Sequence, residues 1–478
     1  MADSSYSPRL RTGVVLCGSG TAGAYQAGAL RAIAESGIKV DIVAAHGSGV
    51  LTALAVAVDG GPRVWDAGGP WTDARLGAAY RWRPALRVAF FGLLACLLLL
   101  LTPFFVLVLA AIVYALATAA SLVGFTDMSG SLVLWYAHAV RWLFDPAMMP
   151  TVVPRVLVLA VLVVLGVLMA SAVAAMRGER SKRRVLGAFW WRLLSSPLDA
   201  TEPSRTGLAL LWHLVHGASS EPAPDGAEVG RRYVDVVADN FGQPGFHEVI
   251  VAVHDLDAQR DLVGSILAPT SRAALETRRA GVGDRAGEVV DFTGPQRETL
   301  ASFLAGALRL PVATAPATIQ FPTDSYWRGE RHRVCDRPEL ASRLVDELAG
   351  IGVEQIILIS PAPPPSIPHS LRPAPIDLRA RMGEVIRSIE AAALTDATAA
   401  AVARCPSVFV IRPEHNPVGP FDFGGVYDET SDRQRTVAEL IQQGHADAYH
   451  HLIEPMALAG EPADGLSFEP VPQQTVRK

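Results

Sequence analysis

Two glycine-rich segments near the start of the chain combine residue types that support catalysis. The first, GSGTAG at 18–23, has the GxGxxG spacing, and the second, HGSG at 46–49, places a serine between two glycines. Backbone N–H groups at such a turn before a helix can bind a pyrophosphate or stabilise the oxyanion of an acyl-transfer intermediate. A serine on a sharp turn between a strand and a helix is typical of a nucleophile elbow.

Apolar strands and helices must hold these turns. Residues 12–16 and 40–45 are predicted as buried strands, and each precedes an apolar helix, at 24–37 and 50–58. Later in the chain, further strands are predicted at 247–256, 355–360 and 407–412, and helices at 297–308, 338–350, 376–403 and 432–459. Strands that alternate with helices predict an α/β domain with a mainly parallel sheet, and the charged segment 272–290 is expected to be a surface loop.

A dinucleotide site is the weaker interpretation of the first turn. Such a site needs an acidic residue at the end of the second strand to bind a ribose. That strand ends at Ala45-His46, and its only acid, Asp41, lies near its start. An oxyanion loop needs no such acid, and a tight turn that simply requires glycines is a further alternative.

The segment 14–54, VVLCGSGTAGAYQAGALRAIAESGIKVDIVAAHGSGVLTAL, resembles the N-terminal part of patatin-like phospholipases. That family has a glycine-rich oxyanion loop, a helix and then a GxSxG elbow. Weaker similarity continues in 249–266, 310–323 and 328–338, where RGERHRVCDRP lies at the place of the family's aspartate motif. The resemblance implies a three-layer α/β/α fold and cleavage of lipid acyl esters by a serine–aspartate dyad, without cofactor or metal.

Carried over position by position, the oxyanion loop corresponds to Gly18, Ser19 and Gly20, with Ser19 in place of a usual glycine. Asp336 corresponds to the dyad aspartate, although Arg337 and the following proline replace the two residues that the family has there. The resemblance therefore implies that Asp336 acts as the base and that the amides of the loop stabilise the oxyanion.

The nucleophile is where the chain departs most from the family. If the residues from Gly49 onward match the start of the family's helix, the nucleophile position falls on Gly47. Small residues are needed two places to either side of an elbow nucleophile; Gly47 has Ala45 and Gly49 there, whereas Ser48 has His46 on one side. Two hypotheses remain: the elbow has slipped by one residue and Ser48 attacks, or the site is catalytically inactive. His46 is either a base or a hydrogen-bonded core residue.

Two stretches without any charged residue indicate a membrane insertion. The first covers 39 residues at 88–126 and the second 21 residues at 156–176. As a helix, the second is roughly 31 Å long, close to the thickness of a bilayer core, while the first, at roughly 58 Å, must overshoot or bend near Pro103. Spans are predicted at about 88–118 and 156–176. The connector at 131–144 is expected to be an interfacial helix, with a re-entrant segment as the alternative.

Arginine and lysine residues flank both outer ends of this insertion, so both ends and the α/β domain are expected on the cytoplasmic side of a multi-pass membrane protein. The predicted organisation is a first half-domain at 11–61, the insertion at 62–199, a second half-domain at 200–460 and a loose tail at 461–478.

The amino-acid composition further narrows the classes of protein to which the chain could belong. Half of the residues are hydrophobic, only 19% are charged and the mean hydropathy is +0.27, which favours a membrane protein. A net charge of −5 gives no electrostatic basis for binding nucleic acid. Four widely spaced cysteines form neither a disulfide framework nor a zinc motif, and the N-terminal residues lack a secretory signal. No metal or cofactor is expected, and the expected partners are membrane lipids.

The sequence thus favours a membrane-anchored patatin-like lipid acyl hydrolase. The alternative is a catalytically inactive patatin-like protein that binds lipid or acts as a scaffold.

Overall fold

The computed structural model describes residues 6–58, 61–66, 69–72, 76–77, 79–178, 196–217, 222–281, 285, 287–364 and 377–458. The expected tail at 461–478 lies outside them. Internal contacts divide the chain into two units, one formed by 1–81 with 199–478 and the other by 82–198.

A nine-stranded sheet is the centre of the first unit, and its main path runs in the order β11-β10-β1-β2-β5-β6-β7. Five adjacent strands are parallel: β11 (Ser407–Ile411), β10 (Gln355–Ile359), β1 (Thr12–Leu16), β2 (Ile42–Ala45) and β5 (Glu248–Asp255). The antiparallel pairings involve β6 (Arg260–Ile266) and β9 (Arg331–Cys335) on β5, and β8 (Ala317–Gln320) on β9, while β7 (Val289–Asp291) is parallel to β6. The predicted mixed α/β fold with a mainly parallel sheet is confirmed.

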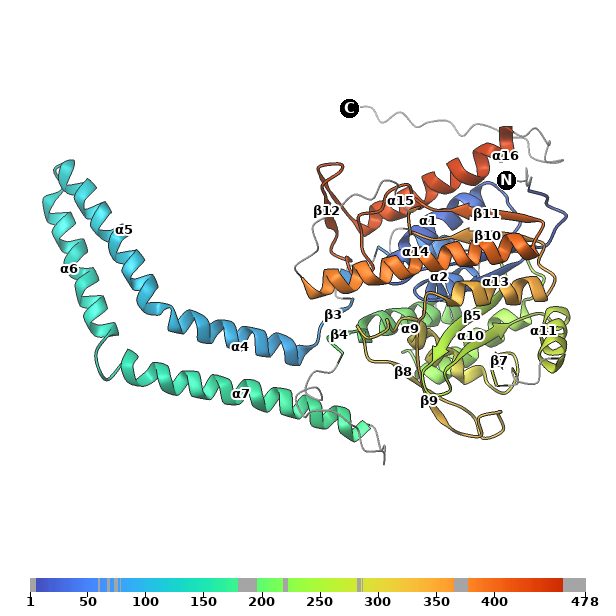
Figure 1. Ribbon diagram of the computed structural model, residues 1–478, viewed down its shortest axis with the longest axis horizontal. Helices are drawn as coiled ribbons and strands as arrows, with labels where there is room; N and C mark the ends of the chain where they lie inside the picture. The colour runs from blue at the N-terminus through green and yellow to red at the C-terminus, as the bar shows by residue number, and fades with distance from the viewer. Residues whose placement is uncertain are drawn as a thin grey trace. The chain divides into compact units, whose positions relative to one another are not determined.

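Helices cover both faces of the sheet, as expected for mainly apolar parallel strands such as β1 and β10, whose residues are all buried. Alternate strand residues such as Val15 and Ala44 pack in one cluster with α13 (Leu340–Gly350) and α14 (Leu378–Arg404). On the opposite face, α2 (Gly49–Val56) packs on β2 and α12 (Leu300–Ala307) packs on β5. Figure 1 shows the long α14 crossing in front of the sheet with α13 beside it.

The remaining helices of this unit complete the layers. They are α3 (Pro62–Trp65), α9 (Thr201–His216), α10 (Gly226–Asp239), α11 (Pro269–Gly281), η3 (Arg297–Thr299), η4 (Tyr449–Ile453) and α16 (Glu454–Leu458). A small hairpin is formed by β12 (Val426–Asp428) and β13 (Arg433–Arg435). Part of the charged segment that we expected to be a loop is helical, because α11 extends to residue 281.

Two helices pack unusually closely. α1 (Ala22–Glu35) begins five residues after β1 and lies against α15 (Val437–Ala448). A Cβ atom placed on Gly28 would lie 1.8 Å from the carbonyl oxygen of Ile441, and one placed on Gly444 would lie 2.0 Å from that of Tyr25. Glycine on each helix is therefore what allows the two backbones to touch.

Residues 62–81, which the sequence assigned to the insertion, belong to the α/β unit. Trp71 and Tyr80 are buried in it, and the Tyr80 hydroxyl donates to the carbonyl of Leu308. The second unit therefore begins at Trp82 rather than at residue 62. β3 (Arg81–Trp82) pairs with β4 (Leu198–Asp199) where the chain leaves and re-enters the α/β unit.

The second unit contains four helices, α4 (Pro84–Leu100), α5 (Thr102–Leu122), α6 (Thr126–Leu143) and α7 (Met149–Gly178). α4 lies beside α7, and α5 lies beside α6 (Figure 1). The first apolar run breaks between α4 and α5, next to Pro103 in the first turn of α5, so the bend expected near this proline is present. The predicted interfacial helix corresponds to α6, whose Tyr136 hydroxyl donates to the carbonyl of Val106 on α5.

Two helices of this unit are long and apolar enough to cross a membrane, at Thr102–Leu122 and Met149–Val173. Only 11% of each span is buried within the protein. Large apolar side chains are therefore exposed along both spans, for example Leu107 and Leu159.

Candidate active site

Three strand ends bring the candidate residues together. The glycine-rich turn at 18–23 follows β1, the turn at 46–48 follows the adjacent β2, and Asp336 follows β9. β9 pairs with β5, which lies next to β2, so a residue distant in sequence reaches the same edge of the sheet. The carboxyl ends of the strands in an open α/β sheet are where ligands usually bind.

Asp336 is fully buried and is the central acceptor of this cluster. Its Oδ1 lies 3.0 Å from Nδ1 of His46, and its Oδ2 accepts a hydrogen bond of 2.8 Å from the hydroxyl of Ser19. Its own N–H donates to the carbonyl of Arg309 at 2.8 Å, which fixes the turn after β9. The structure thus joins Asp336 to the loop serine and to the elbow histidine.

Ser48 has different partners. Its Oγ donates to the carbonyl oxygen of Gly18 and accepts from the N–H of Gly23, each at 3.2 Å. Its own N–H also donates to the Gly18 carbonyl at 3.2 Å. Within the described ranges, no hydrogen bond joins Ser48 to Asp336. The predicted pair of Ser48 and Asp336 is therefore not in contact in this arrangement.

Gly47 has the geometry of an elbow nucleophile position. Its φ of +60° lies in the left-handed region that side chains rarely adopt. A Cβ atom built on it would lie 2.8 Å from Oδ2 of Asp336 and only 2.4 Å from the carbonyl oxygen of Gly18. Position 47 therefore faces the carboxylate, and the Gly18 carbonyl fills part of the space that a side chain there would need.

The predicted oxyanion loop is strongly bent, with φ of +120° at Gly18 and +60° at Gly20. The Ser19 N–H, one of the candidate oxyanion donors, donates at 2.8 Å to Oε1 of Glu390 on α14. A Cβ on Gly20 would lie 1.8 Å from the carbonyl oxygen of Pro420, which also accepts the N–H of Thr21 at 3.3 Å. The protein's own chain therefore occupies this side of the turn, where a dinucleotide phosphate would approach.

Burial and neighbouring charges shift two pKa values here. Burial alone lowers the pKa of His46, but the charge and hydrogen bond of Asp336 outweigh it and raise the pKa to about 10. Burial raises the pKa of Glu390 to about 7, against the hydrogen bond from Ser19. Nδ1 of His46 is thus in direct contact with Asp336, and the Nε2 atom of His46 is buried without a hydrogen-bond partner in the described structure.

A small cavity adjoins these groups. Its polar lining includes His46, Glu390 and Ser360, and its apolar lining is formed by Cys17, Pro338, Ala341, Ala393 and Leu394, with Gly18 between them. In this arrangement the gap between these side chains has no room for a water-sized molecule, so a ligand could enter only if they moved apart.

Sequence reasoning missed Glu390. On α14 it occupies a stripe of buried residues, with Ile386 four positions before it and Leu394 four after it. A lone acidic residue at a core-facing position was the available signal, because a buried carboxylate needs a partner. Ser19 was predicted for its amide, whereas the structure also joins its hydroxyl to Asp336.

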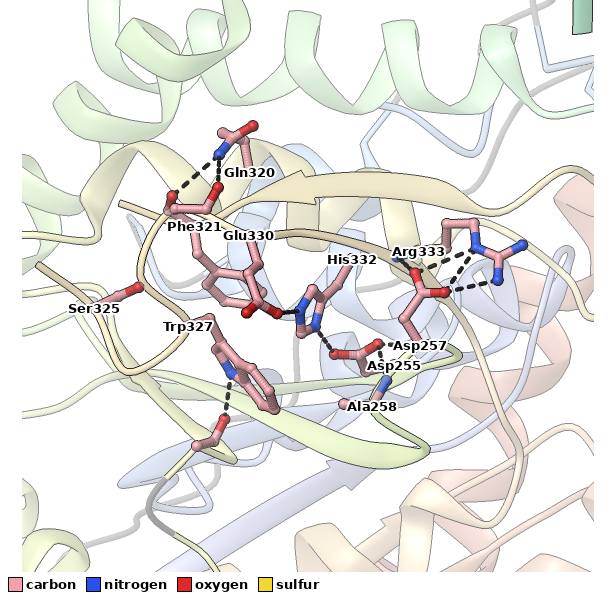
Figure 2. A network of polar contacts seen from close by, with 12 residues as sticks. Asp255, Asp257, Ala258, Gln320, Phe321, Ser325, Trp327, Glu330, His332 and Arg333 are labelled. Atoms are coloured by element: carbon pink, nitrogen blue, oxygen red, sulfur yellow. Dashed lines mark hydrogen bonds and ion pairs between the residues drawn. The ribbon is translucent and has the colours of Figure 1, made fainter. Parts of the chain in front are cut away.

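A second buried histidine lies on β9, just before Asp336. His332 has Nδ1 against Oδ2 of Asp255 on β5 and Nε2 against Glu330, as Figure 2 shows. The ring of Trp327 packs on it with centroids 4.5 Å apart, and the ring of Phe321 with centroids 5.1 Å apart. This cluster clamps β9 to β5 and so helps to hold the strand that carries the candidate base. Within the described residues, no group of three or more histidine, cysteine or acidic side chains is arranged to hold a metal ion.

Comparison with known proteins adds little to this geometry. No family model matches the chain, and no curated protein matches it. Among solved structures, the chain is similar to VipD from Legionella pneumophila, with 10% sequence identity and a TM-score of 0.25, over 95% of this chain and 67% of that chain. This likeness is too distant to inform function, so the residues of the site have to carry the functional argument.

Proposed function

We propose that this protein is a membrane-anchored acyl-ester hydrolase of the patatin-like type that acts on lipids through a serine and an aspartate. The observation that carries the proposal is the position of the Asp336 carboxylate, fully buried between two left-handed glycine turns and in contact with a serine hydroxyl. A carboxylate that accepts a proton from a hydroxyl, beside backbone amides at the start of a helix, is the minimum machinery for acyl transfer.

The second unit supports the membrane part of the proposal. α5 and α7 are long enough to span a bilayer and expose their apolar side chains. Basic residues before the first apolar run and after the second support a cytoplasmic position for both outer ends, because positively charged flanks are usually retained on that side. In this proposal, the protein crosses the membrane more than once, its α/β unit is cytoplasmic, and the anchor raises the local concentration of lipid substrate.

A second candidate function is a non-catalytic, lipid-binding or scaffolding role. It is favoured by the absence of a side chain at Gly47 and by the Ser19 N–H, which a carboxylate of the protein already occupies. In that case the fold is retained, but the residues of the predicted elbow do not take part in catalysis.

Hydrolysis by the full chain in detergent or nanodiscs separates the two functions. Asp336→Asn should abolish release of fatty acid from fluorogenic phospholipids, because the amide cannot accept the proton. Asp255→Asn is the matched control, since Asp255 is also fully buried and also contacts a histidine, but lies outside the site. Turnover that survives in Asp336→Asn contradicts the proposed mechanism. Absence of turnover in the wild-type chain, together with retained lipid binding, favours the second function.

The topology has its own test. A reporter inserted at residues 218–221, in the α/β unit, should be accessible only from the cytoplasmic side of intact cells. Accessibility from the opposite side contradicts the proposed orientation.

A further inference from the structure

We propose that Ser19, on the glycine-rich loop, is the nucleophile of this site, and that neither residue of the predicted elbow attacks. This inference rests on the proposed hydrolase function and names the residue that performs it. Three independent features of the site carry it: the partner of the Asp336 carboxylate, the geometry at Gly47 and the hydrogen bonds of Ser48.

The first feature is the partner of the base. Oδ1 of Asp336 is held by His46, so Oδ2 is the oxygen that remains to accept a proton. The hydroxyl that donates to Oδ2 is that of Ser19, at 2.8 Å, and both side chains are buried. A nucleophile and its base must lie within hydrogen-bonding distance, and among the described serines this pair meets that requirement at Asp336.

The second feature is the space at the elbow. A side chain on residue 47 would point at the same Oδ2, with its Cβ at 2.8 Å. Glycine at this position leaves that oxygen free, and Ser19 uses it. The chain therefore has a serine where the resemblance expects a glycine, and a glycine where it expects a serine, and both positions face one carboxylate oxygen. Relative to the pattern that the sequence resembles, the serine hydroxyl is thus on the other turn, and the aspartate is at the same position.

The third feature is the orientation of Ser48. Its proton is directed at the Gly18 carbonyl, and its oxygen accepts the N–H of Gly23 in α1. These bonds tie the two turns together, which is a structural role. Neither bond leads to a group that could accept a proton during attack.

The proposed reaction is ester hydrolysis through an acyl-enzyme, and it consumes only the ester and water. Ser19 Oγ forms a bond to the ester carbonyl carbon while its proton passes to Asp336, and the carbonyl electron pair moves to oxygen. Collapse of this tetrahedral adduct expels the alcohol, which takes the proton from Asp336 and leaves an acyl group on Ser19. Water then attacks the acyl carbon, gives its proton to Asp336, and the acid leaves as Ser19 regains its hydrogen.

α2 begins at Gly49, immediately after the bend that faces Oδ2 of Asp336. The N–H groups of Val50 and Leu51 in its first turn donate to the carbonyls of Gly47 and Ser48, at 3.3 and 3.2 Å. The contribution of α2 to the site is therefore the positive end of its helix dipole, which favours negative charge at this bend. Substrate must also reach Ser19, which is buried and whose N–H is bound by Glu390 of α14.

Mapping of a covalent adduct tests the proposal in the unmodified full chain. The protein in phosphatidylcholine nanodiscs is treated with a fluorophosphonate, which phosphonylates activated serines, and is then digested with trypsin. Cleavage after Arg31 and Lys39 separates Ser19, in 12–31, from Ser48, in 40–63. We expect the adduct on Ser19, and an adduct on Ser48 or on any other serine overturns the proposal. No adduct under conditions in which the protein hydrolyses lipid also overturns it.

Variants give a second, quantitative measurement. Ser19→Ala should lower turnover by about 1,000-fold, as expected when a nucleophile is removed. Ser265→Ala is the matched control, because Ser265 is an equally buried serine that lies on β6, outside the site, and the variant should keep turnover within about threefold of wild type. Thermal unfolding shows whether each variant is folded. If Ser19→Ala does not fold, the adduct map on the unmodified chain still decides.

Failure of the Ser19 assignment and failure of the proposed hydrolase function give different experimental results. If Ser48→Ala abolishes both turnover and the adduct while Ser19→Ala retains both, the protein is a hydrolase but Ser19 is not its nucleophile. If the wild-type chain shows neither turnover nor adduct on any lipid ester tested, the proposed function itself fails, and with it this inference.

Discussion

The elbow geometry makes a quantitative prediction for Gly47→Ala. The residue keeps a φ of +60°, which costs an L-residue about 1–2 kcal/mol. The new Cβ would also lie 2.4 Å from the Gly18 carbonyl oxygen, a main-chain atom that no rotamer change can move. Overpacking of this kind costs about 1–3 kcal/mol, and the lower entropy of the unfolded chain returns about 0.4–1 kcal/mol. The net loss of stability should be about 1–4 kcal/mol.

Gly352→Ala is the matched control for the backbone term. Its φ is +85°, yet a Cβ on it would meet no atom within 4 Å. The difference between the two variants isolates the contact at the elbow, about 1–3 kcal/mol. At about 2 °C per kcal/mol, Gly47→Ala should melt roughly 2–6 °C below Gly352→Ala.

The assay is thermal unfolding of both variants in the same detergent, followed by near-ultraviolet circular dichroism, which reports on the aromatic core. Equal melting temperatures for the two variants would show that the Gly18 carbonyl does not occupy the space in front of position 47. The argument that the elbow lacks room for a side chain would then be refuted.

Three further predictions follow from burial and contact. Burial raises the pKa of Glu390 from 4.5 to about 7, so the stability that the protonated carboxyl provides is lost as pH rises between these two values. Glu390→Gln should therefore remove about 1–3 kcal/mol of the change in unfolding free energy between about pH 4.5 and 7. For His332, burial lowers the pKa but the two carboxylate partners raise it further, above 6.5; the stability it adds is complete below 6.5 and is lost as pH rises through its raised pKa, a loss that should be absent from melting curves of His332→Gln. Gly444→Ala would place a Cβ 2.0 Å from the Tyr25 carbonyl oxygen and should cost about 3 kcal/mol in denaturant unfolding, whereas Gly424→Ala, with no atom within 4 Å, should change stability by less than about 0.5 kcal/mol.

The central sheet could be predicted from sequence because its parallel strands are buried on both faces. Continuous apolar runs such as 12–16 and 355–360 therefore indicated β1 and β10 almost to the residue. α11 could not be recognised in this way, because few of its described side chains are buried and its sequence lacks an apolar stripe. Residues 62–81 were assigned to the insertion because they carry mixed composition, whereas the burial of Trp71 depends on contacts with α1 that no local pattern encodes.

Prediction of the candidate site from the sequence meets a different limit. The family resemblance put the two glycine turns and Asp336 in one site, and in the structure these segments are in contact. The direction of each hydroxyl, however, depends on single backbone angles, such as the φ of +60° at Gly47. A shift of one residue in such a turn redirects a side chain entirely, so spacing could not decide between residues 47 and 48. Glu390 arrives from a helix more than three hundred residues away in sequence, and only tertiary structure reveals its bond to Ser19.

In the patatin-like pattern that the sequence resembles, the position of Ser19 carries a glycine of the oxyanion loop and the position of Gly47 carries the nucleophile. In space they are related, because each position faces Oδ2 of Asp336 from its own turn. A buried carboxylate without a donor costs free energy, and with glycine at position 47 the hydroxyl of Ser19 supplies a donor to this oxygen. What distinguishes an inactive site from a rearranged one is which hydroxyl reaches the carboxylate oxygen, and in this chain that hydroxyl belongs to Ser19.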